Sequence, residues 1–261
     1  MPRERLDKKL LELGLASTRE KAQALIMAGM VIVDGKVIDK PGFLVKEGHK
    51  IELRGGLKYV SRGGYKLEYA LEHFKIDVKG FVALDVGSST GGFTDCLLQR
   101  GAIKIYAVDV GRSQMDIKLR VDPRVILYEK TDARSLTQKH IPEKVDIITV
   151  DVSFISVTKI LPNVVKFLKD SGIMLILVKP QFELTPQKVK KGIVRSFEDK
   201  VHAVLKVCQK LEELGFSTGG VIKAKPKGTK GNEEFFILAG RHTPQLGDIK
   251  KAVEDAVKES I

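Results

Sequence analysis

At 261 residues, the chain is long enough for one large domain or for two domains of unequal size. Its hydrophobic content of 43% and charged content of 30% are those of a globular protein and exclude a disordered or fibrous chain. No apolar run approaches the roughly 20 residues that a bilayer-spanning helix needs. The charged start MPRERLDKKLLELG lacks the apolar core of a signal peptide, so we expect a cytoplasmic protein with no membrane partner.

The net charge of +12 favours an anionic partner, with nucleic acid the first candidate, although the basic residues are spread along the chain. Cys96 and Cys208 lie far apart, without a C-x-x-C pair or a neighbouring histidine cluster. This spacing predicts two buried free thiols, and neither a disulfide scaffold nor a metal site.

The first part of the chain contains the signals of two helices followed by a small sheet. Leucines recur at helical spacing until Gly14, and Ser17 with Glu20 has the spacing of a capping box that opens a second helix. Apolar residues then alternate around Asp34-Gly35, a strong hairpin signal, and a further turn leads to the strand HKIEL. The pattern predicts a small α+β domain.

This part resembles the RNA-binding domain of the ribosomal protein S-four type over most of residues 3–53, in its element order and in STREKAQALIMAGMVIVDGKVI. The resemblance implies binding to structured RNA through shape and backbone. We place the domain at residues 1–53 and a linker at 54–60. Basic side chains here could follow a phosphate backbone or form a solvated surface. The RNA-binding candidates are Arg3, Arg5, Arg19, Lys21 and Arg62.

The stretch FVALDVGSSTGGFTDCLL has the pattern of a strand, a glycine-rich turn and a helix. A serine stands where a dinucleotide-binding turn needs its second glycine, and Phe93 stands where a P-loop needs its lysine. The remaining pattern is a carboxylate at a strand end followed by glycines that let a ligand approach the backbone. It suits a cofactor with a sugar and a charged amino-acid end, such as S-adenosylmethionine. The candidate residues in this turn are Asp85, Gly87, Ser88, Gly91, Gly92 and Phe93.

Two further carboxylates follow strand patterns. Asp109 ends IKIYAVDVG, where it could accept hydrogen bonds from both ribose hydroxyls, and Asp132 follows VILYE, where it would lie beside the adenine. The alternative for each is capping of a helix N-terminus. Together with the glycine-rich turn they strengthen the prediction of a cofactor site.

Strand and helix patterns alternate through the rest of the chain, from KVDIITVDVSF and IMLILVKP to the strands around FSTGGVIKAK and EFFILAG. They predict an α/β domain over residues 61–261 with a mostly parallel, Rossmann-like sheet and a terminal antiparallel strand. Ligands of such sheets bind at the carboxyl ends of the strands.

Four charged residues stand at element ends where this fold would gather them. Asp151 follows the strand DIITV, and Lys179 ends the apolar strand LILV. Lys66 begins the helix before the first sheet strand, and Glu234 starts the last strand, with Glu233 as an ambiguous neighbour. Separate ion pairs or solvated side chains are the alternative for each, but four such placements together favour a catalytic group.

With these residues in view, the chain resembles the TlyA family, also labelled hemolysin A, of ribosomal RNA cytidine 2'-O-methyltransferases. The matching pieces are SRGGYKL, LDVGSSTGGFTD, AVDVG, VDVSFIS, LVKPQFE and GNEEFF, in the family's order over nearly the whole chain. The catalytic part is also similar to FtsJ-like RNA methyltransferases, with a class I methyltransferase fold. Their Lys–Asp–Lys–Glu tetrad falls on Lys66, Asp151, Lys179 and Glu234. Family members vary at the adenine carboxylate, and this chain has Asp132 there.

The resemblance implies methyl transfer from S-adenosylmethionine to a ribose hydroxyl of ribosomal RNA, free or in a subunit, with no metal required. Lys179 would accept or orient the hydroxyl proton, either as a neutral amine or by orienting an oxygen lone pair. Asp151 favours the charged ammonium, so we expect it to orient Lys179, and Glu234 would tether Lys66 or the ribose.

Two other functions stay open on the sequence: a non-catalytic RNA-binding assembly factor, and a membrane-lytic protein. The second would need an apolar span or a strongly amphipathic membrane helix, and the sequence offers neither. The helical pattern in TPQLGDIKKAVEDAVKESI predicts a tail helix that docks on the main domain. The target nucleotide and the oligomeric state are not fixed by the sequence, although a monomer is favoured.

Overall fold

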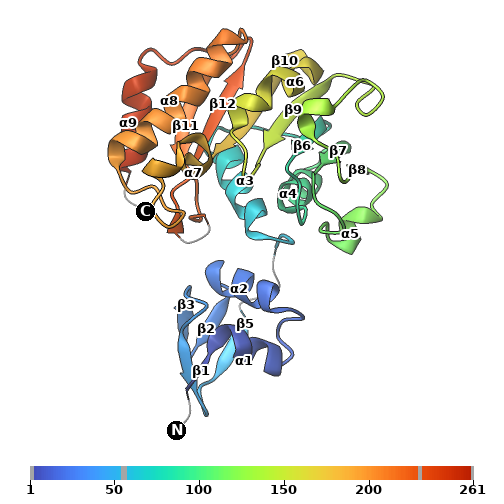
Figure 1. The fold of residues 1–261 in the computed structure, drawn as a ribbon. Coiled ribbons are helices and arrows are strands. Elements are labelled where there is room, and N and C mark those ends of the chain that lie inside the picture. The colour runs from blue at the N-terminus through green and yellow to red at the C-terminus, as the bar shows by residue number, and fades with distance from the viewer. Residues whose placement is uncertain (1–2, 54–57, 229–230, 260–261) are drawn as a thin grey trace. The chain divides into compact units, whose positions relative to one another are not determined.

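The computed structural model describes residues 3–53, 58–228 and 231–259. Two compact units make up the chain, Met1–Gly63 and Gly64–Ile261 (Figure 1). Each unit has its own hydrophobic interior, so each is described by itself.

The first unit contains two helices and two small antiparallel sheets. The strand β2 (Val31–Val33) lies between β3 (Lys36–Ile38) and β5 (Ile51–Leu53), and β1 (Arg3–Arg5) pairs with β4 (Leu44–Lys46). The helices α1 (Leu6–Glu12) and α2 (Arg19–Met27) cover the sheet residues with a small core that includes Leu10 and Ile26. The α+β character that the sequence predicts is confirmed.

In this unit the structure confirms the turns predicted from the sequence and corrects one predicted helix cap. Asp34 and Gly35 both have positive φ, 49° and 78°, as a tight two-residue hairpin requires, and Gly14 follows α1 with φ +67°. The N-cap of α2 is Thr18, not the expected Ser17: the Thr18 hydroxyl accepts a hydrogen bond from the Lys21 amide at 3.2 Å. The pairing of β1 with β4 was not predicted, because three-residue strands carry no readable period.

The second unit is built on a seven-stranded sheet in the order β11-β12-β10-β9-β6-β7-β8. All pairs from β10 to β8 are parallel, and β12 runs antiparallel to both β10 and β11. The strands are β6 (Val82–Val86), β7 (Lys104–Val108), β8 (Val125–Tyr128), β9 (Val145–Val150), β10 (Leu168–Val178), β11 (Ser217–Lys223) and β12 (Phe235–Gly240). This confirms the predicted mostly parallel α/β sheet with its terminal antiparallel strand.

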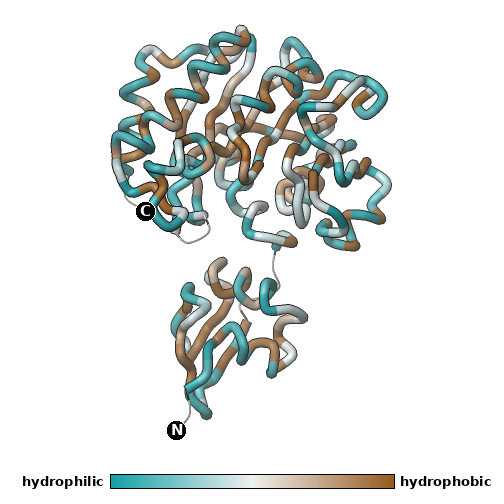
Figure 2. Tube along the Cα trace, in the orientation of Figure 1, coloured by the Kyte–Doolittle hydropathy of each residue, from teal (hydrophilic) through white to brown (hydrophobic). Residues whose placement is uncertain are grey.

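Helices lie on both sides of this sheet (Figure 1), because its central strands bury both faces. Along β12, Phe235 belongs to the core shared with α8, whereas the Phe236 ring packs on Phe93 of α4 with centroids 6.0 Å apart. Figure 2 shows the corresponding concentration of hydrophobic residues along the strands. The α-helices are α3 (Arg62–His73), α4 (Gly92–Gln99), α5 (Ile117–Arg120), α6 (Leu161–Val164), α7 (Pro180–Glu183), α8 (Phe197–Glu213) and α9 (Ile249–Lys258), and the 3-10 turns are η1 (Ala133–Ser135), η2 (Val157–Lys159), η3 (Val165–Phe167) and η4 (Pro186–Lys188).

The tail helix α9 docks on the main unit, as its apolar spacing predicts. Val253 and Val257 are buried in the large core, and the buried Lys223 ammonium of β11 donates a hydrogen bond to the Val257 carbonyl at 3.0 Å. Cys96 and Cys208 are buried free thiols, also as predicted. Burial raises the pKa of the Cys208 thiol to about 11, so this sulfur is a packing group.

Candidate active site

Strand register gathers the charged candidates at one edge of the large sheet. Val150 of β9 lies opposite Val86 of β6 and Ile176 of β10, so Asp151 follows directly at the carboxyl edge. Val178 of β10 lies opposite Phe235 of β12, and because that pair is antiparallel, Lys179 and Glu234 are the next opposed positions. Residues far apart in sequence thus meet where ligands of parallel sheets bind.

At this edge the four residues form two ion pairs. The Lys66 ammonium lies 2.5 Å from Glu234, and both side chains are almost fully buried. The Lys179 ammonium lies 2.6 Å from the Asp151 carboxylate and donates a hydrogen bond to the Ser153 hydroxyl at 3.0 Å. Ser153 thus accepts one N–H of Lys179, whereas Asp151 holds the ammonium by charge, since its Oδ1 makes no hydrogen bond within the described residues.

Glu233, the ambiguous neighbour of Glu234, takes part in a different cluster. Its carboxylate lies 2.6 Å from the Lys200 ammonium and 3.3 Å from that of Lys223. Successive residues beside a strand point to opposite faces, so Glu234 reaches Lys66 while Glu233 reaches α8 and β11.

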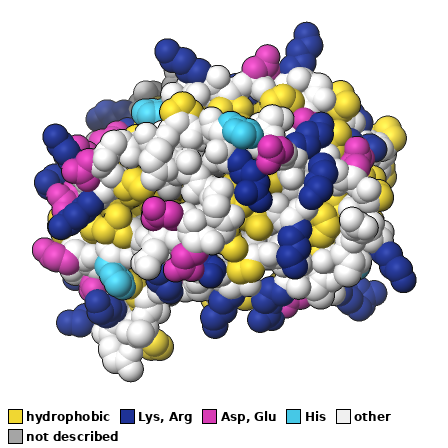
Figure 3. All heavy atoms as spheres, turned by 90° about the horizontal axis from the view of Figure 1, so that it is seen from above, with side chains coloured by type: hydrophobic (Ala, Val, Ile, Leu, Met, Phe, Trp, Pro, Cys, Tyr) yellow, Lys and Arg dark blue, Asp and Glu magenta, His cyan; other side chains and the backbone are white. Residues whose placement is uncertain are grey.

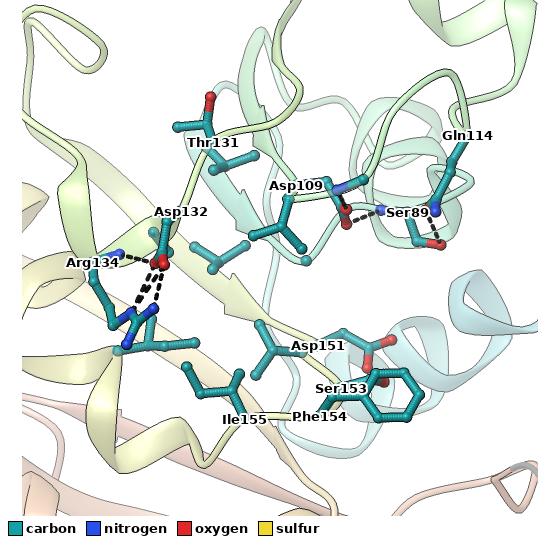
Figure 4. A pocket seen from close by; sticks show the side chains of 18 residues that line it. Ser89, Asp109, Gln114, Thr131, Asp132, Arg134, Asp151, Ser153, Phe154 and Ile155 are labelled. Carbon is teal, nitrogen blue, oxygen red and sulfur yellow. Dashed lines mark hydrogen bonds and ion pairs between the residues drawn. The ribbon is translucent and has the colours of Figure 1, made fainter.

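A cavity of about 520 Å³ is lined in part by Asp151 of the second ion pair, and Figure 4 shows the side chains around it. Its volume is in the range of ordinary cofactor pockets. Of the residues singled out in the sequence, those that line it are Gly87, Asp109, Asp132 and Asp151. The cavity also brings in Ser89 and Gln114, which the sequence patterns did not single out.

Asp109 is fixed by the backbone of two loops at the cavity. Its Oδ2 accepts a hydrogen bond from the Ser89 amide at 2.8 Å, and its Oδ1 accepts one from the Gly111 amide at 2.6 Å (Figure 4). Each carboxylate oxygen can accept a second hydrogen bond, so the group can still receive two hydroxyls.

Asp132 is held by Arg134, two residues further along the chain. Its Oδ1 accepts a hydrogen bond from the Arg134 amide at 2.8 Å, which caps η1, and the guanidinium donates to both oxygens (Figure 4). The Arg134 hydrogen bonds lower the pKa of the Asp132 carboxyl. The capping alternative therefore describes this residue in the structure, although Asp132 also lines the cavity.

Asp85 lies beneath the glycine-rich turn and is not among the residues that line the cavity. It is fully buried and accepts hydrogen bonds from the hydroxyls of Thr94 at 2.7 Å and Thr149 at 2.9 Å. Burial raises the pKa of the Asp85 carboxyl from 3.8 to about 6. This carboxylate joins α4 and β9 to the strand that carries the turn.

The glycines of the turn permit close approaches between elements. A Cβ at Gly87, whose φ is +85°, would lie 2.5 Å from the carbonyl oxygen of Asp151. A Cβ at Gly91 would lie 2.2 Å from a methyl carbon of Leu119. Gly87 thus lets the turn touch the backbone of the catalytic candidate. The remaining candidates of this turn, Ser88, Gly92 and Phe93, are buried and are not among the lining residues.

The loop after Asp151 carries an aromatic residue that the sequence analysis did not single out. Phe154 is 92% exposed and has φ +65°, which is unfavourable for a bulky side chain. Its ring lies 5.1 Å from that of Phe182, which follows Lys179 by three residues. The signal that could have identified Phe154 in the sequence is its position, an aromatic residue three places after the strand-end carboxylate Asp151.

A buried carboxylate ties this loop to the Lys179 turn. Glu183 Oε1 accepts a hydrogen bond from the Val157 amide at 2.7 Å, and its Oε2 accepts one from the Ser156 hydroxyl at 2.5 Å. The Lys206 ammonium lies 3.6 Å from Oε2. Glu183 therefore links the segment that follows Asp151 to the segment that follows Lys179.

In the first unit, two of the RNA-binding candidates converge on a buried carboxylate. Arg5 donates hydrogen bonds to both oxygens of Asp7, at 2.9 and 2.8 Å, and Arg19 donates one at 3.2 Å. These hydrogen bonds, the one from Arg5 first, hold the pKa of the Asp7 carboxyl well below its usual range. Both guanidinium side chains stay about half exposed, so they can still contact a phosphate.

The other candidates lie on three different elements. Arg3 lies in β1 and Lys21 in α2, and both are exposed, whereas Arg62 is the first residue of α3. On the face drawn in Figure 3, Lys and Arg side chains lie at many separate positions with Asp and Glu between them. Within the described ranges, no helix combines the length and hydropathy of a membrane span.

The fold, the cavity and the two ion pairs define a methyltransferase of the FtsJ-like class, and the comparison with known families agrees. The FtsJ-like methyltransferase family matches residues 59–241, and the S4 domain matches residues 4–51. The chain therefore belongs to the FtsJ-like methyltransferases and carries an S4 domain in front of the catalytic unit.

Similarity over the full length places the chain in one branch of that class, the TlyA family. It is 40% identical to the 16S/23S rRNA (cytidine-2'-O)-methyltransferase TlyA of Mycobacterium tuberculosis, covering 99% of this chain and 97% of that protein. It is 44% identical to YqxC of Bacillus subtilis, a candidate rRNA methyltransferase, covering 98% and 95%. A solved structure of a candidate hemolysin from Streptococcus thermophilus matches with a TM-score of 0.76 and 39% identity, covering 98% and 95%.

Proposed function

We propose that this chain transfers a methyl group from S-adenosylmethionine to the ribose 2'-hydroxyl of a cytidine in ribosomal RNA. The observation that carries the proposal is the Lys179–Asp151 ion pair, with a separation of 2.6 Å, at the edge of a cavity that Asp151 itself lines. The relative from Mycobacterium tuberculosis, whose printed name states this activity, supports the choice of substrate.

The cavity fits S-adenosylmethionine by its chemistry. Asp109 offers two carboxylate oxygens to ribose hydroxyls, and the amides of Ser89 and Gly111 already hold it in place. Apolar side chains such as Val110 and Ile155 line the same cavity and suit the faces of an adenine ring. We assign the adenine edge to Asp132, in competition with its bond to Arg134.

When bound, S-adenosylmethionine supplies the methyl group on a positively charged sulfur. The chain's own residues prepare the hydroxyl. The Asp151 carboxylate, 2.6 Å away, and the Ser153 hydroxyl, which accepts one N–H, hold the Lys179 nitrogen in place. As an ammonium, Lys179 donates a further N–H to the hydroxyl oxygen and orients its lone pair, and the hydroxyl proton passes to solvent when the methyl group is transferred. As a neutral amine, it takes the hydroxyl proton itself.

We assign Lys66 and Glu234 to the place where the ribose hydroxyl binds. Both side chains are buried and their charged atoms are 2.5 Å apart, so neither charge needs to move during the reaction. The pair can therefore position a ribose hydroxyl or the Lys179 side chain. Correct alignment of two reactants accounts for roughly 7–11 kcal/mol of a barrier in favourable cases.

We assign RNA binding to the first unit, through Arg3, Arg5, Arg19 and Lys21, and to Arg62 at the start of α3. The exposed Phe154 ring, next to Asp151 in sequence, offers a surface on which a base can stack. Because ribosomal RNA is the substrate, we place the protein in the cytoplasm.

The test is a transfer assay with purified ribosomal subunits, free ribosomal RNA and labelled S-adenosylmethionine. The wild type should label a ribose 2'-oxygen of a cytidine, located by nuclease digestion and mass spectrometry. Lys179→Ala should abolish the label, whereas Lys250→Ala, at an exposed lysine of α9, should keep it. Tight RNA binding without any transfer to these substrates would instead support a non-catalytic assembly factor.

A further inference from the structure

A second pocket of about 420 Å³ adjoins the cofactor cavity, and Phe154 lines both. We propose that this second pocket binds one nucleotide of single-stranded RNA, a neighbour of the nucleotide whose ribose is methylated. The inference rests on the proposed function, because it assumes that RNA is the substrate. It adds a separate binding site to the catalytic one.

The position of the pocket follows from the chain. Gln181 and Phe182, which line it, come two and three residues after Lys179. Ile155 and Ser156, on the opposite side, come four and five residues after Asp151. The pocket is therefore built from the two segments that follow Asp151 and Lys179 in the chain, so a nucleotide bound there would lie close to the ribose that is methylated.

Two aromatic rings give the pocket a stacking surface. Phe154 and Phe182 lie 5.1 Å apart at an interplanar angle of 49°, so they are tilted and do not cover each other face to face. Phe154 is largely exposed and Phe182 is partly exposed, and bases of single-stranded RNA stack on aromatic faces without regard to sequence. Phe154 is 92% exposed, so its ring is not part of the hydrophobic core.

The charges of the pocket suit a phosphate. Lys159 is exposed, lines the pocket and makes no ion pair or hydrogen bond through its ammonium with the described residues. Lys206 also lines it and donates a hydrogen bond to the Glu183 carbonyl at 2.8 Å. The acidic lining group, Glu183, has both oxygens engaged by Ser156 and Val157, so it presents little free acceptor capacity to a ligand.

Gln181 supplies a polar group that is not yet satisfied. Its side-chain Oε1 is shielded from solvent and accepts no hydrogen bond within the described residues. A buried acceptor without a donor costs free energy, so a rotation that meets a base amino group is favourable. The pocket thus combines a stacking ring, a free cation and an amide, the three groups that recognise a nucleotide.

The binding test uses tryptophan fluorescence, because the chain contains no tryptophan. Phe182→Trp places a single reporter in the pocket, and Ile103→Trp places one at an exposed position before β7, at the opposite edge of the sheet. Titration with hexauridylate should quench the first reporter and leave the second unchanged. Quenching of both, or of neither, would overturn the proposal.

Two further variants identify the groups that bind. In the Phe182→Trp background, Lys159→Ala should weaken hexauridylate binding and reduce the slope of log K against log salt by about 0.7, as expected for one phosphate contact on a single strand. Lys250→Ala, the matched control, should leave both unchanged. An unchanged salt slope for Lys159→Ala would refute the phosphate contact.

Methyl transfer then tests whether the pocket serves the reaction. Phe182→Ala should raise KM for the ribosomal substrate by about tenfold while the Kd for S-adenosylmethionine, measured by calorimetry, stays as in the wild type. A weaker cofactor Kd would show that the pocket belongs to the cofactor site and would overturn the proposal. If the wild type transfers no methyl group, the proposed function fails, but quenching by hexauridylate would still show the nucleotide site.

Discussion

The buried Lys66–Glu234 ion pair allows stability and catalysis to be separated. Lys66 is 7% exposed and Glu234 is 3% exposed, with 2.5 Å between their charged atoms. Removal of one partner leaves the other charge buried and unpaired, which costs about 3–5 kcal/mol. Replacement of both by apolar groups of similar size removes both charges and is close to neutral.

We therefore expect Lys66→Met and Glu234→Leu each to lower the free energy of unfolding by about 3–5 kcal/mol, and the double variant to recover most of that loss. For a unit of this size, the single variants should lower Tm by roughly 10 °C. Urea unfolding followed by circular dichroism measures the free energies, and the methyl-transfer assay run alongside should find all three variants inactive.

The exposed pair Lys210–Glu213, with side chains 30% and 51% exposed, is the matched control. Glu213→Gln should change stability by less than about 1 kcal/mol. Single variants of the buried pair that lose no more than this control would refute the calculation. Full activity in the double variant would show that Lys66 and Glu234 are not needed for catalysis.

Three further predictions concern the cofactor side of the site. The pKa of the Asp85 carboxyl is raised to about 6, so the folded chain holds its proton up to a higher pH than the unfolded chain does. Its contribution to stability is complete below its unfolded pKa near 3.8 and is lost as the pH rises through 6, by about 3 kcal/mol. Urea titrations from pH 4 to 7 should show this loss in the wild type and not in Asp85→Asn; equal slopes would contradict the burial argument. Gly87→Ala should weaken both stability and activity, because its Cβ would lie 2.5 Å from the Asp151 carbonyl oxygen at a φ of +85°; an unaffected variant in thermal unfolding and transfer assays would show that the turn can shift. Asp109→Ala should raise the Kd for S-adenosylmethionine by at least about tenfold in calorimetry, and Asp132→Ala should raise it less because Arg134 already engages that carboxylate; the reverse order would exchange their roles.

The sequence predicted features that depend on neighbours along the chain. Alternating strand and helix patterns predict parallel strands, and the carboxyl ends of parallel strands meet at one edge, so Asp151 and Lys179 could be brought together without coordinates. The choice of Glu234 over Glu233 is consistent with the structure, since the two residues reach opposite faces.

Other features depend on which side chain folds back onto which, and sequence patterns do not contain that information. For Asp132 the sequence left both a cofactor contact and a helix cap open, and only the structure shows that it caps η1 and that the Arg134 guanidinium folds back onto it. Asp85 ends a strand in the same way and is instead buried beneath the turn. Arg5 and Arg19 both contact Asp7, a carboxylate to which the sequence patterns gave no role.

Phe154 has a consequence for engineering. Its ring is 92% exposed, so its removal forfeits little burial, and its φ of +65° is one that glycine adopts at no steric cost. Phe154→Gly should therefore relieve backbone strain while it deletes the surface assigned to a base. Directed evolution that selects only for heat resistance would accept this substitution and lose the stacking surface that we propose for RNA, so any such screen needs a transfer assay as its second filter.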